Sequence, residues 1–135
     1  TRPPSVTIAS PARFVPASTR KVAHCEVQAY VAPNVGFELR LPAGDWNGKF
    51  LHQGCGGLCG DVQPATCDDA LARRYAIAVT DMGHQGQPWQ AAWAFNNLPA
   101  EIDFAFSSVT MRTASSVCAH PVVREVAAVI RRSPK

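Results

Sequence analysis

Residues 50–60, FLHQGCGGLCG, bring together two cysteines, one histidine and four of the chain's nine glycines, and Gly48 lies just upstream. Clustered glycines allow a backbone to turn tightly and to approach a bound group closely. Three kinds of site use such a loop: a phosphate cradle, a metal site built on cysteines, and the backbone wall of an esterase site.

Phosphate-binding loops have stricter sequence requirements than this loop meets. A P-loop needs a lysine followed by serine or threonine after its second glycine, and no lysine follows any glycine between positions 54 and 60. The dinucleotide fingerprint that begins at Gly54 and Gly56 needs a third glycine where Cys59 stands. The sequence therefore excludes a phosphate cradle.

The cysteines of this region are too unevenly spaced for a zinc knuckle. Cys55, Cys59 and Cys67, with His52 or His84, give the spacing C-x3-C-x7-C rather than paired C-x2-C motifs. We expect no metal and no other cofactor, and we predict a local disulfide between Cys59 and Cys67.

Two further cysteines, Cys25 and Cys118, are far from this group in the sequence. We expect them to be free or to have partners outside the chain. Cysteine usage alone does not decide between a reducing and an oxidising compartment.

An esterase wall fits the glycine loop better. His52-x-Gly54-x-Gly56-Gly57, at the exit of a predicted strand, is close to the HGGG-type loop of esterases and lipases. In that loop backbone N–H groups face the oxyanion of a tetrahedral intermediate. The candidates for such donors are Gly54, Cys55 and Gly56. An ordinary glycine turn fits the same pattern equally well.

Alternating sequence patterns predict the strands that position this loop. Residues 26–33 and 36–43 alternate apolar and polar side chains on either side of Pro33-Asn34, which predicts an antiparallel hairpin. Residues 49–54 form a third predicted strand, which ends where the glycines begin.

A helix and a buried strand are predicted to follow the loop. Residues 67–75 begin with acidic and end with basic side chains after Thr66, a favourable N-cap. Residues 76–80, AIAVT, are apolar on both faces. This order describes a βαβ crossover in a partly parallel sheet, and the fold class is α/β.

Residues 1–21 contain four prolines and no apolar periodicity, so we expect an irregular arm before a single domain over 22–135. Ile102, Phe106 and Val109 predict one apolar face of a helix over 98–116.

A further helix is expected over 121–132, with the apolar side chains Val122, Val123, Val126 and Ile130 on its inner side.

Composition limits the partners of this chain. The 135 residues are 47% apolar and 17% charged, and no apolar run approaches the ~20 residues that cross a membrane. The net charge is +3, and the only local excess of basic residues lies at the C-terminal end: Arg124, Arg131, Arg132 and Lys135. We expect neither a nucleic-acid nor a membrane partner, because a nucleic-acid footprint needs a clustered basic face.

Four segments resemble, in order and spacing, the start of the tannase and feruloyl esterase family: HCEVQAYVAP, GFELRLPAGDWNGKFLHQGCGG, ALARRYAIAVTDMGHQG and AWAFNNLPAEIDFAF. The resemblance covers residues 22–109, and DWNGKF (45–50) and TDMGH (80–84) are its most specific parts. That family comprises mostly secreted enzymes of the α/β-hydrolase fold that cleave esters of phenolic acids. The resemblance implies a partial α/β-hydrolase-like mixed sheet with an antiparallel N-terminal hairpin and flanking helices.

The resemblance also assigns roles to single residues. Gly54 to Gly57 match the family's oxyanion-side loop, with Cys55 where a small residue is more usual. Asp81 and His84 match a segment that shapes the end of the sheet, and we expect them to support the loop. The location implied is secreted or periplasmic, and the implied substrate is a phenolic ester.

The family's nucleophile does not occur in this chain. It lies in a Cys-Ser-x-Gly-Gly elbow, and none of the 49 residues after Gly86 is a glycine. The family is one of serine carboxylesterases, but we assign no catalytic residue here and expect the chain alone to be inactive. A thiol mechanism, with Cys55 as nucleophile and His52 or His84 as base, is the alternative catalytic reading.

Two hypotheses about function remain, one enzymatic and one noncatalytic. The chain is either the N-terminal part of a phenolic-ester hydrolase, truncated before its nucleophile, or a noncatalytic secreted module with a binding or structural role. A sheet that ends before its central strand would present an unpaired edge, through which copies of the chain could associate.

Overall fold

A computed structural model describes residues 6–106. The helix predicted over 121–132, Val109 and Cys118 lie outside these residues. The elements run in the order β1 (Val6–Ile8), β2 (Arg13–Val15), β3 (His24–Val31), β4 (Val35–Pro42), β5 (Phe50–Gln53), η1 (Pro64–Cys67), α1 (Asp68–Ala72), β6 (Ala76–Thr80) and α2 (Leu98–Ala105).

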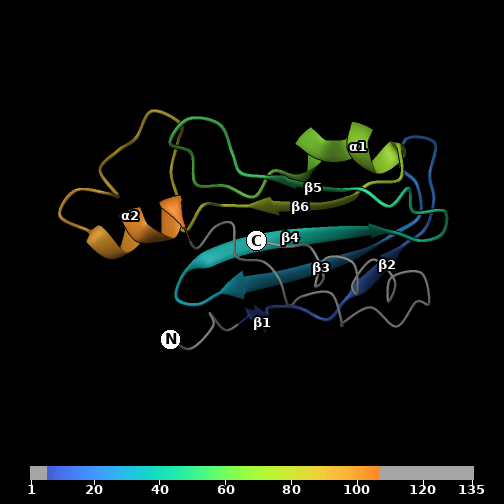
Figure 1. The fold of residues 1–135 in the computed structure, drawn as a ribbon, viewed down its shortest axis with the longest axis horizontal. Coiled ribbons are helices and arrows are strands. Elements are labelled where there is room, and N and C mark those ends of the chain that lie inside the picture. The colour runs from blue at the N-terminus through green and yellow to red at the C-terminus, as the bar shows by residue number, and fades with distance from the viewer. Residues whose placement is uncertain (1–5, 107–135) are drawn as a thin grey trace.

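The described strands form one mixed sheet in the order β1-β3-β4-β6-β5, and β2 also pairs with β3. The predicted hairpin is confirmed: β3 and β4 are antiparallel, from His24 opposite Pro42 to Val31 opposite Val35. β5 and β6 are parallel, as the predicted crossover requires. In Figure 1 these strands lie side by side, with α1 above β5 and β6.

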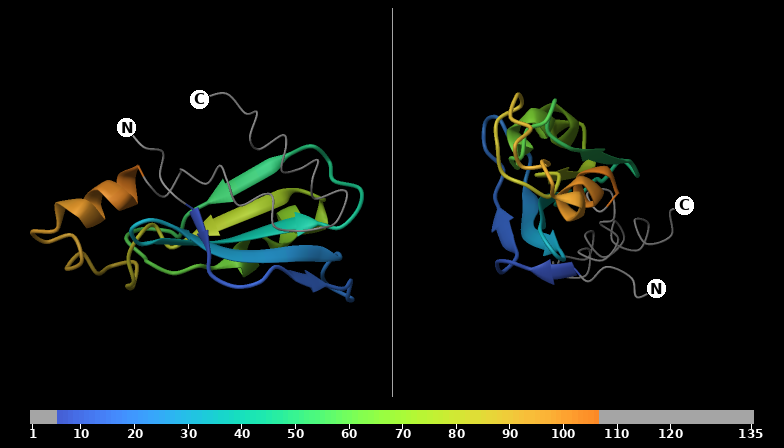
Figure 2. Two further views of the ribbon diagram at one scale, coloured as in Figure 1. Left: turned by 90° about the horizontal axis from the view of Figure 1, so that it is seen from below. Right: turned by 90° about the vertical axis from the view of Figure 1, so that its left-hand side faces the viewer.

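Burial follows the position of each strand in the sheet. β6 is buried at all five positions, as its unbroken apolar pattern predicts. Two apolar clusters form the core: one joins β3, β4 and β6 through residues such as Val27 and Leu41, and the other packs α1 against β6 through Leu71 and Ile77. Figure 2 shows α1 on one face of the sheet.

The predicted N-cap of the crossover helix is wrong. Pro64 starts a 3-10 turn one turn earlier than expected, and Thr66 lies inside it. The Thr66 hydroxyl donates to the carbonyl of Gln63 at 2.7 Å, and Cys67 occupies the N-cap of α1 without a side-chain cap. Proline suits a first helical turn because it has no N–H to satisfy there.

Residues 6–21 are less irregular than predicted. β1 and β2 both pair antiparallel with β3, at opposite ends of that strand. Val6 and Ile8 pack against the apolar core. Each strand has only three residues, too few to show an alternating pattern, and the open edge of β3 supplies the hydrogen-bond partners that order them.

α2 lies beyond the carboxyl ends of β5 and β6 (Figure 1). Its predicted inner face is wrong within the described residues: Ile102 and Phe106 are 46% and 68% exposed, and the buried position is Asp103. No described element covers the apolar side of α2. The helix instead packs through Asp103 against Gly83, where an added Cβ would lie 2.7 Å from the Asp103 Cβ.

Candidate functional site

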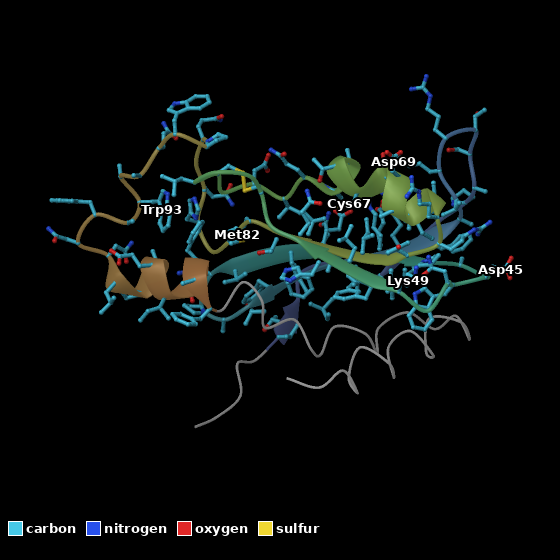
Figure 3. The ribbon with its side chains drawn as sticks, turned by 45° about the horizontal axis from the view of Figure 1, so that its top comes forward. Asp45, Lys49, Cys67, Asp69, Met82 and Trp93 are labelled. Carbon is cyan, nitrogen blue, oxygen red and sulfur yellow. A yellow bond between two sulfur atoms is a disulfide. The ribbon has the colours of Figure 1, made fainter. Side chains whose placement is uncertain are left out.

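The glycine loop lies at the carboxyl end of the parallel strands. It follows β5 directly, and the segment 81–88 follows β6 at the same end. Figure 3 shows Met82 and Trp93 at this end, with Asp45 and Lys49 at the opposite end. Open α/β sheets place their ligand sites at the carboxyl ends of strands, so the fold puts the loop where a site is expected.

Three backbone hydrogen bonds join the loop to the segment after β6. Leu58 N–H donates to the carbonyl of Pro88 at 2.9 Å, Gly60 N–H donates to Gly86 at 2.9 Å, and Gly86 N–H donates back at 3.3 Å. The two backbones are so close that a Cβ on Gly60 would lie 2.6 Å from the carbonyl carbon of His84. Position 60 therefore requires glycine, because there is no room for a Cβ atom.

The candidate oxyanion donors lie before this contact. Among the described residues, no backbone or side-chain acceptor takes a hydrogen bond from the N–H groups of Cys55 and Gly56. Gly56 is exposed, and an added Cβ there would meet nothing within 4 Å. Two adjacent N–H groups of the loop thus have no acceptor within residues 6–106.

Gly54 has a different reason to be glycine. A Cβ at this position would overlap the Sδ atom of Met82, which reaches across from the end of β6. The positive φ in this stretch of the loop is at Gly57, where φ is +65°. Any other residue at position 54 would therefore place its Cβ against the Met82 side chain.

The predicted disulfide between Cys59 and Cys67 is wrong. Cys55 and Cys59 are joined instead, with Cα atoms 5.7 Å apart. The turn between them, in which Cys59 N–H donates to Gly56, brings the two close together. Cys67 is a free, buried cysteine in the 3-10 turn, and its thiol donates to Gln53 Oε1 at 3.3 Å.

This pairing removes two alternatives. Cys55 is not a free thiol, so the nucleophile reading with His52 or His84 does not fit the structure. The zinc set loses two of its three thiolates for the same reason, and the described residues hold no group of three or more metal-ligating side chains. Cys25 is also disulfide-bonded, which contradicts a free thiol at that position.

We predict that mapping without reductant will find Cys55 linked to Cys59 and Cys67 as a thiol. Cleavage before Asp61 separates the first pair from Cys67, and tandem mass spectrometry then locates the bond. Because Cys67 is 2% exposed, it should react with an alkylating reagent only after unfolding. Recovery of a peptide pair linked through Cys67 would contradict the structure.

Asp81 joins the end of β6 to the start of β4. Its Oδ1 accepts hydrogen bonds from the N–H groups of Gly36 at 3.0 Å and Gly83 at 2.8 Å, and its Oδ2 accepts one from Gln85 at 3.3 Å. Burial raises the pKa of Asp81, although these hydrogen bonds and nearby His84 oppose the shift. This geometry is consistent with the predicted supporting role.

We predict that Asp81→Asn gains stability relative to the native chain as the pH rises. A raised pKa in the folded state means that the stabilising contribution of Asp81 is complete below the unfolded pKa of ~3.9 and is lost as pH rises through the folded pKa. Asparagine keeps the oxygen that accepts from Gly36 and Gly83 but has no charge to bury. Urea unfolding of both chains between pH 3 and 7 tests this, with Asp81→Ala as the control that removes the acceptor.

His84 is positioned as a hydrogen-bond donor to the loop. Its Nε2 lies 2.8 Å from the carbonyl oxygen of Leu58, and since a carbonyl only accepts, the Nε2–H tautomer is present. The ring stacks on Trp93 with centroids 3.8 Å apart and is tilted against Phe104. No hydrogen bond joins it to Asp81 within the part of the chain that the structure describes. The two residues therefore do not form an acid–base couple there.

The family model for tannase and feruloyl esterase matches residues 19–125. The chain belongs to this family. Two curated relatives carry esterase or hydrolase names. An uncharacterized esterase of Xanthomonas campestris pv. campestris is 30% identical over an alignment of 91 residues, and the match covers 64% of this chain and 16% of the relative. Mono(2-hydroxyethyl) terephthalate hydrolase of Piscinibacter sakaiensis is 36% identical over an alignment of 77 residues, and the match covers 45% of this chain and 13% of the relative.

Solved structures show that the tannase-family chain has an esterase fold. An esterase from Aspergillus oryzae matches with a TM-score of 0.61 and 22% identity, over 81% of this chain and 25% of the other. Feruloyl esterase B from the same organism matches with a TM-score of 0.53 and 24% identity, over 74% and 22%. The chain thus corresponds to a minor part of each of these relatives.

Sequence reasoning missed several residues around the loop of this tannase-family chain. Met82 has a positive φ of 62°, which no sequence pattern indicated, and it fills the space beside Gly54. Trp93 stacks on His84, a contact that no sequence pattern indicated. Trp46 packs against the core, whereas Trp89 is 76% exposed.

No helix of the described chain is long and apolar enough to cross a membrane.

Proposed function

We propose that this chain is the N-terminal portion of a secreted carboxylic ester hydrolase that acts on phenolic-acid esters, with the nucleophile segment absent from the chain. The observation that carries the proposal is the glycine loop after β5, whose N–H groups at Cys55 and Gly56 have no acceptor among the described residues. Membership of the tannase and feruloyl esterase family supports it.

The residues of this chain would act on the transition state. When a serine attacks an ester carbonyl, negative charge develops on the carbonyl oxygen, and aligned N–H donors stabilise that charge more than they stabilise the substrate. Cys55 and Gly56 would donate, and the lack of a side chain at Gly54 makes room for Met82 beside the loop. The serine, histidine and acid would come from the remainder of the domain.

The relatives support an aromatic ester as substrate. One is a hydrolase of mono(2-hydroxyethyl) terephthalate and one solved structure is a feruloyl esterase, so both names refer to esters of aromatic acids. We propose maturation in a secreted or periplasmic location, since a disulfide such as Cys55–Cys59 persists in oxidising compartments.

The open edge of the sheet is where the remainder of the domain would pack. β5 pairs with β6 alone among the described strands, and Phe50 on β5 is 39% exposed. Self-association of two copies through this edge is the competing use. Size-exclusion chromatography with light scattering distinguishes them, since only the second makes a concentration-dependent dimer of residues 1–135.

Ester hydrolysis tests the proposal in two steps. Purified residues 1–135 should hydrolyse feruloyl, galloyl and small aryl esters no faster than the Cys55→Ala chain. A chimera that carries residues 19–106 in place of the matching segment of the Piscinibacter sakaiensis hydrolase should hydrolyse aromatic esters. A folded chimera without activity would contradict the proposal, as would activity of the isolated chain that Cys55→Ala abolishes.

A further inference from the structure

We infer that residues 84–88 form a clamp that holds the glycine loop in a fixed shape, and that His84 is a positioning residue for the N–H donors of that loop. The catalytic consequence of the clamp rests on the proposed function, whereas its existence does not. The inference comes from four hydrogen bonds, one disulfide and one stacked ring, all within the described residues.

The clamp is hydrogen-bonded to the loop at Leu58 and Gly60. Leu58 is held on both sides of its backbone: its N–H donates to the carbonyl of Pro88 at 2.9 Å, and its carbonyl accepts from His84 Nε2 at 2.8 Å. Gly60 exchanges two hydrogen bonds with Gly86. The positions of Leu58 and Gly60 are therefore both fixed by hydrogen bonds to the same five-residue segment.

The disulfide carries this restraint to the candidate donors. Cys59 lies between Leu58 and Gly60 in the sequence, and its sulfur is bonded to that of Cys55. Fixing Leu58 and Gly60 thus also limits where Cys55 and the neighbouring Gly56 can move. Donors that are already in place need no reorganisation as the oxyanion forms, which is the source of their catalytic effect.

The ring of His84 is itself held in position. It is 9% exposed and lies against Trp93 and Phe104, so the residues before and within α2 set its orientation. The other ring nitrogen, Nδ1, is buried without a hydrogen-bond partner among the described residues. The structure therefore assigns His84 to donation toward Leu58.

Amide hydrogen exchange of residues 1–135 tests the clamp directly. In His84→Leu the amides of Leu58 and Gly60 should exchange about tenfold faster than in the native chain, while β3 and β4 amides keep their rates. His84→Gln, whose side-chain amide can donate to Leu58, should restore most of the protection. Unchanged exchange at Leu58 and Gly60 in folded His84→Leu would overturn the clamp.

A matched pair of tryptophan variants keeps the test decisive if His84→Leu does not fold. Trp93→Leu removes the ring stacked on His84 and should accelerate exchange at Leu58 and Gly60. Trp89→Leu removes an exposed ring, adjacent in sequence to the clamp, and should not. Equal effects of the two substitutions on these amides would overturn the role of the stacked His84 ring.

The active chimera tests the catalytic consequence separately. His84→Leu should lower kcat by about 10- to 100-fold with little change in KM, because the donors act mainly in the transition state, and His84→Gln should recover part of the rate. Accelerated exchange with an unchanged kcat would overturn the oxyanion assignment and leave the clamp standing.

Discussion

Replacing Gly54 by valine in the active chimera is expected to lower kcat by about 10² to 10³, the loss usual for one missing oxyanion donor. A valine side chain would collide with Met82, so the loop backbone would have to shift, and the N–H donors at Cys55 and Gly56 would be misplaced. The stacked and clamped residues would remain in place, so the protein should stay folded. Steady-state kinetics with an aromatic ester, alongside circular dichroism, provide the measurement.

Cys55→Ala is the comparison for this prediction. It leaves the backbone N–H in place but opens the disulfide to Cys59, so we expect a loss in kcat smaller than that of Gly54→Val. The opposite order, with Gly54→Val tolerated and Cys55→Ala inactive, would show that the chemistry of the loop depends on its sulfur.

Gly60→Ala is expected to destabilise residues 1–135 by about 2 kcal/mol or more, as overpacking of a closely fitted site does. The added methyl would overlap the backbone carbonyl of His84, and a backbone atom cannot move aside as the end of a side chain can. The Gly60–Gly86 hydrogen bonds would have to separate. Urea unfolding monitored by tryptophan fluorescence measures the change.

Gly56→Ala is the matched control, since the same methyl added four residues earlier meets nothing within 4 Å and Gly56 has no positive φ. We expect a change within about 0.5 kcal/mol, as for other exposed substitutions. Similar losses of stability for both variants would mean that the loop is not packed against the segment after β6.

Local patterns predicted the elements that depend on local order. The alternation in residues 26–43 predicted the hairpin, and the apolar run 76–80 predicted the buried strand β6. The predicted strand over 49–54 is present as β5, which ends where the glycines begin. These signals are reliable because each depends on how side chains repeat along one element.

The wrong predictions concern choices among distant or equivalent partners. Three cysteines within 13 residues allow several pairings, and only the turn of the loop decides that Cys55 meets Cys59. The predicted face of α2 was taken from spacing alone, but a helix buries the side that the rest of the fold contacts, here Asp103. β1 and β2 form because they can pair with the edge of β3 through backbone hydrogen bonds.

The sequence by itself determined the family, through motifs such as DWNGKF and TDMGH, and determined that a glycine loop follows a strand. Only the tertiary structure decided that Leu58 and Gly60 lie against residues 84–88 and that His84 donates to the loop. The physical reason is that a motif records which residue types a site needs, whereas hydrogen bonds between segments 26 residues apart depend on how the sheet and α2 bring those segments together.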